Sequence, residues 1–202
     1  LKALGVNITV PPKKVEESLE KVGIGFLFAP LLHGAMRYAI GPRREIGIRT
    51  IFNILGPLTN PAGATCQVLG VYDGALAETI AGVLGRMGST HALVVHGEDG
   101  LDEITTTTTS VISEYKDGKV QTFVLDPSDY GIPRAKAEDL AGGDAAENAR
   151  IARAVLEGEE GPRRDIVILN AAAAILAGGL APDFEKAVAL AKESIDSGAA
   201  LK

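Results

Sequence analysis

The sequence predicts an α/β fold with a mostly parallel central sheet flanked by helices, an antiparallel hairpin and part of a small helical domain. The β-prone residues 66–71, the helically periodic residues 75–87 and the apolar residues 92–95 follow one another through short links. This order is typical of a parallel βαβ unit. Residues 111–115 and 120–125 then flank an Asp-Gly turn, which predicts a hairpin.

A helical portion precedes the predicted sheet. Pro11-Pro12 starts an apolar stripe at helical spacing that Gly23 ends, and residues 33–40 predict a second helix. We therefore expect the remnant of a small helical domain and a hinge over residues 1–40, and an α/β domain over residues 41–202.

Three helices are predicted after the hairpin, over residues 144–156, 165–177 and 183–197. Gly142-Gly143 before the first of them is similar to a glycine-rich phosphate loop. However, Asp144 and Glu147 stand three residues apart at the start of a periodic run, which predicts a capping box, and an aspartate at the N-cap would repel a phosphate. We therefore interpret this loop as structural.

Composition limits the function classes. The chain has 202 residues, 46% of them hydrophobic, and its 20 Lys and Arg against 26 Asp and Glu give a net charge of −6, which argues against binding to a bulk polyanion. A single cysteine, Cys66, fits a reducing compartment such as the cytoplasm.

The apolar run over residues 170–180 is too short to span a bilayer, so we expect no membrane partner. The opening at Leu1 reads like the end of a helix, so we expect the beginning of the protein to lie elsewhere.

An acidic cluster follows the second predicted strand. Asp99, Asp102 and Glu103 come directly after His96-Gly97, and loops beyond the carboxyl ends of parallel strands are where open α/β sheets bind ligands. Adjacent carboxylates supply the hard oxygen ligands that Mg²⁺ takes alongside waters and phosphates. An acidic surface turn explains the same spacing equally well.

The other polar features have structural explanations that are at least as good. Five consecutive threonines, residues 105–109, predict a β-branched edge strand. Arg43-Arg44 could hold a carboxylate through two parallel N–H bonds, or could be a solvated pair at a helix end. His33 alone is more often a packed or exposed helical residue than a functional one. His96 has no nucleophile pattern near it, and no zinc or Walker motif occurs.

Several stretches taken together resemble the anthranilate phosphoribosyltransferase family. They run in one order over the whole chain: residues 43–53, 56–61, 94–97, 99–103, 142–145 and 169–173. The resemblance implies transfer of the 5-phosphoribosyl group from phosphoribosyl pyrophosphate to the amine of anthranilate, a Mg²⁺-dependent step of tryptophan biosynthesis that releases pyrophosphate. It also implies a homodimer.

The resemblance also implies roles for individual residues. Asp102 and Glu103 match the acidic pair that binds Mg²⁺, and Arg43 matches the arginine that binds the anthranilate carboxylate. His33 and Pro57 match positions that line the anthranilate site. We name no general base, because an aromatic amine is already nucleophilic when neutral.

The chain departs from the family pattern at its start. Family members carry, upstream of this region, a Gly-Thr-Gly-Gly-Asp loop and a Lys-His-Gly-Asn stretch that hold the phosphates and the ribose, and neither occurs in these 202 residues. We therefore expect this segment in the same or a second chain. Two alternatives remain: a pyrimidine nucleoside phosphorylase, and a non-catalytic relative that binds nucleic acid or another phosphorylated ligand.

Overall fold

The computed structural model describes residues 1–32, 45, 47, 56 and 58–202, which form two compact units, Leu1–Ala62 and Gly63–Lys202. The helix predicted over residues 33–40 lies outside the described residues, as do the site candidates His33, Arg43 and Pro57. The boundary predicted at residue 40 lies there too and stays a prediction.

The first unit contains the helix predicted after the two prolines. Helix α1 (Pro12–Val22) has a proline in its first turn, where no intrahelical N–H bond is lost. It ends at Gly23, whose φ of 83° is left-handed and whose N–H bonds back to the carbonyls of Ser18 and Leu19. Helix α2 (Ala29–Leu32) follows.

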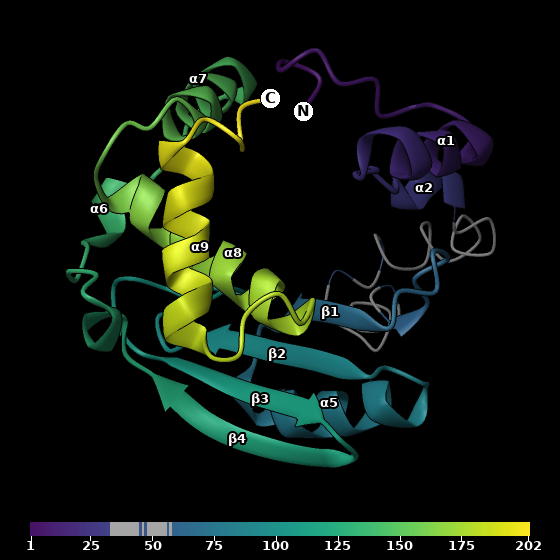
Figure 1. Ribbon diagram of the computed structural model, residues 1–202, viewed down its shortest axis with the longest axis vertical. Coiled ribbons are helices and arrows are strands. Elements are labelled where there is room, and N and C mark those ends of the chain that lie inside the picture. The colour runs from purple at the N-terminus through teal and green to yellow at the C-terminus, as the bar shows by residue number, and fades with distance from the viewer. Residues whose placement is uncertain (33–44, 46, 48–55, 57) are drawn as a thin grey trace. The chain divides into compact units, whose positions relative to one another are not determined.

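The second unit is built on a four-stranded sheet in the order β1-β2-β3-β4 (Figure 1). The strands are β1 (Cys66–Gly70), β2 (His91–Gly97), β3 (Ser110–Lys116) and β4 (Lys119–Leu125). The pair β1–β2 is parallel, whereas β2–β3 and β3–β4 are antiparallel. The α/β class, the βαβ unit and the hairpin are confirmed. The described sheet is mixed rather than mostly parallel, because the link between β2 and β3 contains no helix and returns the chain antiparallel.

The crossover between the parallel strands is a short 3-10 turn (Gly74–Leu76) and helix α5 (Ala77–Arg86). The helix lies close against the sheet at Gly85, where an added Cβ would be 2.1 Å from the Tyr115 ring of β3. Figure 1 shows α5 on one face of the sheet, and α8 (Pro162–Ala177) and α9 (Phe184–Asp196) on the other. Strand β2 is therefore buried on both faces, in accord with its continuous apolar run.

Three long helices follow the hairpin, as predicted. They are α7 (Ala145–Leu156), α8 and α9, preceded by a 3-10 turn (Pro127–Tyr130) and the short helix α6 (Ala137–Leu140). The Asp144 carboxylate caps α7 by accepting the Glu147 N–H at 2.9 Å. Glu147 itself binds Arg150 rather than closing the predicted box. Helix α8 begins three residues before its predicted start, because Pro162 occupies its first turn.

The main core lies between the sheet and the last two helices. Leu93 and Val95 of β2 and Ile112 of β3 pack with buried residues of α8 and α9, among them Ile168 and Leu169, which are fully buried. In the part of the chain that the structure describes, no helix is both long and apolar enough to cross a bilayer. The core thus packs α8 and α9 against the sheet.

Candidate functional site

The loop of residues 98–109, which joins β2 to β3, contains the acidic cluster and the five threonines. The edge strand predicted for residues 105–109 is wrong, because the chain has no ladder there and β3 begins only at Ser110. Thr105 and Thr106 are fully buried instead. Hydroxyl side chains that bond within a loop compete with strand formation, and the Thr105 and Thr107 hydroxyls do so.

Asp99 is the internal anchor of this loop. Its Oδ2 accepts hydrogen bonds from the hydroxyls of Thr105, at 2.6 Å, and of Thr107, and its Oδ1 accepts the Leu101 N–H at 3.2 Å. Burial alone would raise the pKa of the Asp99 carboxyl, but these hydrogen bonds outweigh it and lower the pKa. Both carboxylate oxygens of Asp99 thus accept hydrogen bonds from the loop itself, and in this Asp99 differs from Asp102 and Glu103.

The loop is fixed to the rest of the unit at two further points. From α8, the Asn170 Oδ1 accepts the Ile104 N–H at 2.9 Å while its Nδ2 donates to the Ile104 carbonyl at 2.8 Å. From the end of β1, Gly70 lies against the backbone of Asp102 so closely that an added Cβ would be 1.5 Å from the Asp102 carbonyl oxygen. Both contacts hold residues next to or within the acidic pair.

Like Glu98 and Asp99, Asp102 and Glu103 are exposed residues of the loop. Among the described residues, neither side chain has a hydrogen-bond or ion-pair partner in the structure. Partial burial raises the pKa of the Glu103 carboxyl, and repulsion from Asp102 and Asp99 raises it further. A cation beside the pair would relieve this repulsion. The structure describes no cluster of three or more potential metal ligands, but the pair fits Mg²⁺, which takes one or two carboxylates with waters and phosphates.

Beside Glu103, the structure has a largely apolar pocket of about 450 Å³ between the loop, α7 and α8. Gly142 and Asn148 line it too. The Asn148 amide clamps Gly143, accepting its N–H and donating to its carbonyl, each at 2.9 Å. An added Cβ on Gly142 would be 2.4 Å from the Asn148 Oδ1. The glycines therefore serve a close backbone approach, in agreement with our structural interpretation of this loop.

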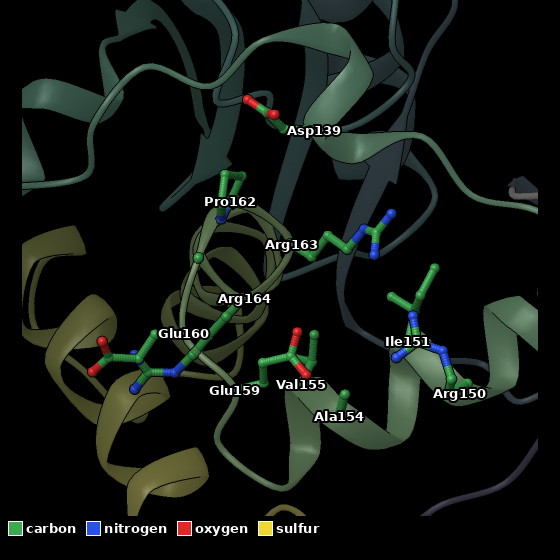
Figure 2. Close-up of a pocket in the computed structure, with 11 residues that line it drawn as sticks. Asp139, Arg150, Ile151, Ala154, Val155, Glu159, Glu160, Pro162, Arg163 and Arg164 are labelled. Atoms are coloured by element: carbon green, nitrogen blue, oxygen red, sulfur yellow. The ribbon is translucent and has the colours of Figure 1, made fainter.

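A second pocket, of about 180 Å³, lies where α8 begins (Figure 2). Its three arginines already bind protein groups: Arg150 pairs with Glu147, Arg163 donates to the Ala141 carbonyl and Arg164 pairs with Asp196. Glu159 and Glu160 line the same pocket, as Figure 2 shows. This balance of charge gives the pocket no preference for a phosphate.

The structure thus brings Asp102 and Glu103 together at a fixed loop, whereas His33, Arg43 and Pro57 lie outside the described residues. The Nδ1 of His96 donates to the Val71 carbonyl at 2.8 Å, so this nitrogen has a structural partner. Sequence reasoning missed Asn170 and Gly70. One signal for Asn170 was present, a single amide within an otherwise apolar helical run, residues 166–177.

Comparison with known proteins extends this result. The family model described as "Glycosyl transferase family, a/b domain" matches residues 1–201. A curated anthranilate phosphoribosyltransferase of Moorella thermoacetica is 60% identical over 99% of this chain, and one of Pelobacter propionicus is 59% identical over all of it. The chain spans 59% and 58% of the lengths of these two relatives.

Solved structures give the same result. The anthranilate phosphoribosyltransferase of Thermus thermophilus has a TM-score of 0.92 and 45% identity, with 99% of this chain and 59% of that one covered. The enzyme of Saccharomyces cerevisiae, solved in complex with PRPP and Mg, has a TM-score of 0.88 and 29% identity, with 99% of this chain and 58% of that one covered. With the family model matched over nearly the whole chain, this chain belongs to the glycosyl transferase family, in its a/b domain.

Proposed function

We propose that the protein to which this chain belongs is an anthranilate phosphoribosyltransferase. It transfers the 5-phosphoribosyl group of phosphoribosyl pyrophosphate to the amine of anthranilate and releases pyrophosphate. The observation that carries this proposal is the pair of free carboxylates, Asp102 and Glu103, on an anchored loop at the carboxyl end of β2. The two curated relatives at 60% and 59% identity support the same substrates.

The reaction is a displacement at C1 of the ribose. The anthranilate nitrogen forms a bond to C1 while the bond from C1 to the pyrophosphate oxygen breaks, and the nitrogen then releases a proton to water. Positive charge develops on the ribose and negative charge on the leaving group. When Mg²⁺ is bound, it neutralises the pyrophosphate and orients it. Asp102 and Glu103 would hold this ion together with waters and substrate phosphates.

The remaining substrate contacts are carried over from the family resemblance. Arg43 would bind the anthranilate carboxylate through two parallel N–H bonds, a geometry that lysine cannot supply. His33 and Pro57 would line the same site. An upstream segment, from the same or a second chain, would supply the loops for the phosphates and ribose, and we propose a homodimer in the cytoplasm.

The test uses the completed protein, which is this chain joined to the upstream segment that family members carry. Loss of anthranilate fluorescence should require both phosphoribosyl pyrophosphate and Mg²⁺. Arg43→Ala should chiefly raise the KM for anthranilate, and Asp102→Ala should chiefly raise the Mg²⁺ requirement. If Arg43→Ala leaves the KM for anthranilate unchanged, the substrate assignment is wrong. If Asp102→Ala titrates with Mg²⁺ like the parent, the metal assignment is wrong.

The nucleic-acid alternative gains no support from the second unit. Of its basic side chains, the adjacent pair Arg163 and Arg164 is engaged with the Ala141 carbonyl and Asp196. DNA binding that weakens steeply with salt would nevertheless favour this alternative over the transferase.

A further inference from the structure

We propose that Asn170 is a positioning residue for the acidic pair. This inference rests on the proposed function, because it assigns to α8 the task of holding the Mg²⁺-binding loop in its productive geometry. Asn170 is 66 residues away from Ile104 in the sequence. In this role Asn170 acts through the backbone of Ile104 and does not need to touch a substrate.

The geometry of the clamp is specific to an asparagine amide. Its Oδ1 accepts the Ile104 N–H at 2.9 Å, and its Nδ2 donates to the Ile104 carbonyl at 2.8 Å. The second Nδ2 hydrogen satisfies the Ile166 carbonyl of α8 at 3.0 Å. Three of the four hydrogen bonds that an amide can make are therefore formed. An alanine makes none of them, and an ionised aspartate has no donor for either carbonyl.

The clamp is mounted on a rigid support. Leu169, Ala172 and Ala173, next to Asn170 on α8, are fully buried in the main core. Ile104, which the amide holds, is itself fully buried. Since Ile104 directly follows Glu103, its fixed backbone limits the directions in which the Glu103 carboxylate can point.

Along the sequence, the residues that Asp99 and Asn170 hold lie on opposite sides of the acidic pair. The Asp99 carboxylate fixes the loop before the pair through the Leu101 N–H, and Asn170 fixes it after the pair through Ile104. Groups that orient metal ligands without touching the metal commonly contribute about 10–100-fold to metal affinity or activity. Loss of the Asn170 clamp should therefore weaken metal binding rather than binding of anthranilate.

The chain contains a matched control in Asn148. This residue also lies on a helix and also clamps one backbone unit through one N–H and one carbonyl, but its partner is Gly143 and not the loop with the acidic pair. Asn148→Ala therefore reproduces the loss of a two-bond amide clamp, while the loop of residues 98–109 keeps its own hydrogen bonds.

The experiment measures metal binding in the completed protein in two ways. The first is the Mg²⁺ concentration that gives half-maximal consumption of anthranilate. The second, independent of turnover, is binding of Mn²⁺ in the presence of inorganic pyrophosphate, followed by electron paramagnetic resonance. Asn170→Ala should raise both midpoints by about tenfold, and the KM for anthranilate should change by less than about twofold. Asn148→Ala should leave both metal midpoints within about twofold of the parent.

Three outcomes overturn the inference. If Asn170→Ala and Asn148→Ala shift the metal midpoints alike, the clamp has only a general structural role. If Asp102→Ala shifts them and Asn170→Ala does not, the positioning role is wrong while the proposed metal site stands. If Asp102→Ala also has no effect, the metal site itself is wrong and the positioning role falls with it. Should Asn170→Ala fail to fold, Asn170→Gln keeps the amide but displaces it by one methylene, and it should shift both midpoints in the same direction.

Discussion

Substitution of Gly70 by alanine tests whether the end of β1 fixes the acidic loop. The added Cβ would lie 1.5 Å from the Asp102 carbonyl oxygen and 2.5 Å from its carbonyl carbon. These are backbone atoms, so no side-chain rotation relieves the clash and the loop or the strand must move. Overpacking of this kind typically costs about 1–3 kcal/mol. If the movement also breaks the bonds between Ile104 and Asn170, each adds about 0.5–1.5 kcal/mol.

Gly70→Ala should therefore lower the free energy of unfolding by about 1–3 kcal/mol through overpacking alone, and by about 2–6 kcal/mol if both bonds between Ile104 and Asn170 also break. Urea unfolding of the chain, followed by circular dichroism, measures this difference. The matched control is Gly82→Ala in α5, where the nearest atoms to an added Cβ are at 3.6 and 3.9 Å. The control should be neutral or stabilising by up to about 1 kcal/mol, because alanine favours a helix over glycine. A Gly70→Ala variant within about 0.5 kcal/mol of the parent would refute the contact, since surface changes without such a contact fall in that range.

Three further substitutions have defined outcomes. Gly85→Ala, three residues along α5 from Gly82, should lower the urea midpoint where Gly82→Ala does not, because its Cβ would lie 2.1 Å from the Tyr115 ring. Asp144→Ala removes the cap of α7 and should lower the free energy of unfolding by about 1 kcal/mol, measured in the same assay. Asp99 has a lowered pKa in the folded chain, so its stabilisation is present above its unfolded value and is lost as the pH falls through the folded one. Urea titrations at several pH values should therefore show Asp99→Asn less stable than the parent at neutral pH, with the difference shrinking below about pH 4; a difference independent of pH would contradict the hydrogen-bond network.

Elements with a signal in neighbouring residues were predictable from the sequence. The βαβ unit follows from periodicities that change within short links, and the hairpin follows from the Asp-Gly turn at residues 117–118. The cap at Asp144 follows from its place before a periodic run. The hairpin turn and the cap join residues a few positions apart, so a local pattern records them. The paired strands of the βαβ unit lie farther apart in the sequence, but each strand and the helix between them has its own local periodicity.

The loop before β3 was mispredicted for a reason of the opposite kind. Threonine favours strands on average, but here two hydroxyls find the Asp99 carboxylate six and eight residues earlier in the chain. The preference of threonine for strands was therefore applied correctly. The hydrogen bonds to Asp99, which compete with strand formation, leave no signal in the sequence pattern that predicts a strand.

The supports of the acidic pair could not be predicted, because they join distant parts of the sequence. Gly70 meets Asp102 only once β1 and β2 are paired, and Asn170 meets Ile104 only once α8 has packed on the sheet. The spacing of Asp102 and Glu103 alone left a metal site and a surface turn equally possible. The structure removes neither carboxylate from solvent, and it gives both a fixed backbone.

The link between Ile104 and Asn170 also orders events during synthesis. All four strands precede Asn170 in the chain, so the sheet can pair while α8 is still being made. A growing chain that ends before residue 170 has the acidic residues but not the helix that holds them. The contact between Ile104 and Asn170 can form only after the long chain segment between them has closed into a loop, which costs entropy. The loop of residues 98–109 should therefore reach its final form late in folding. A nascent chain would therefore acquire its sheet first and its ordered carboxylates only after helix α8 has emerged.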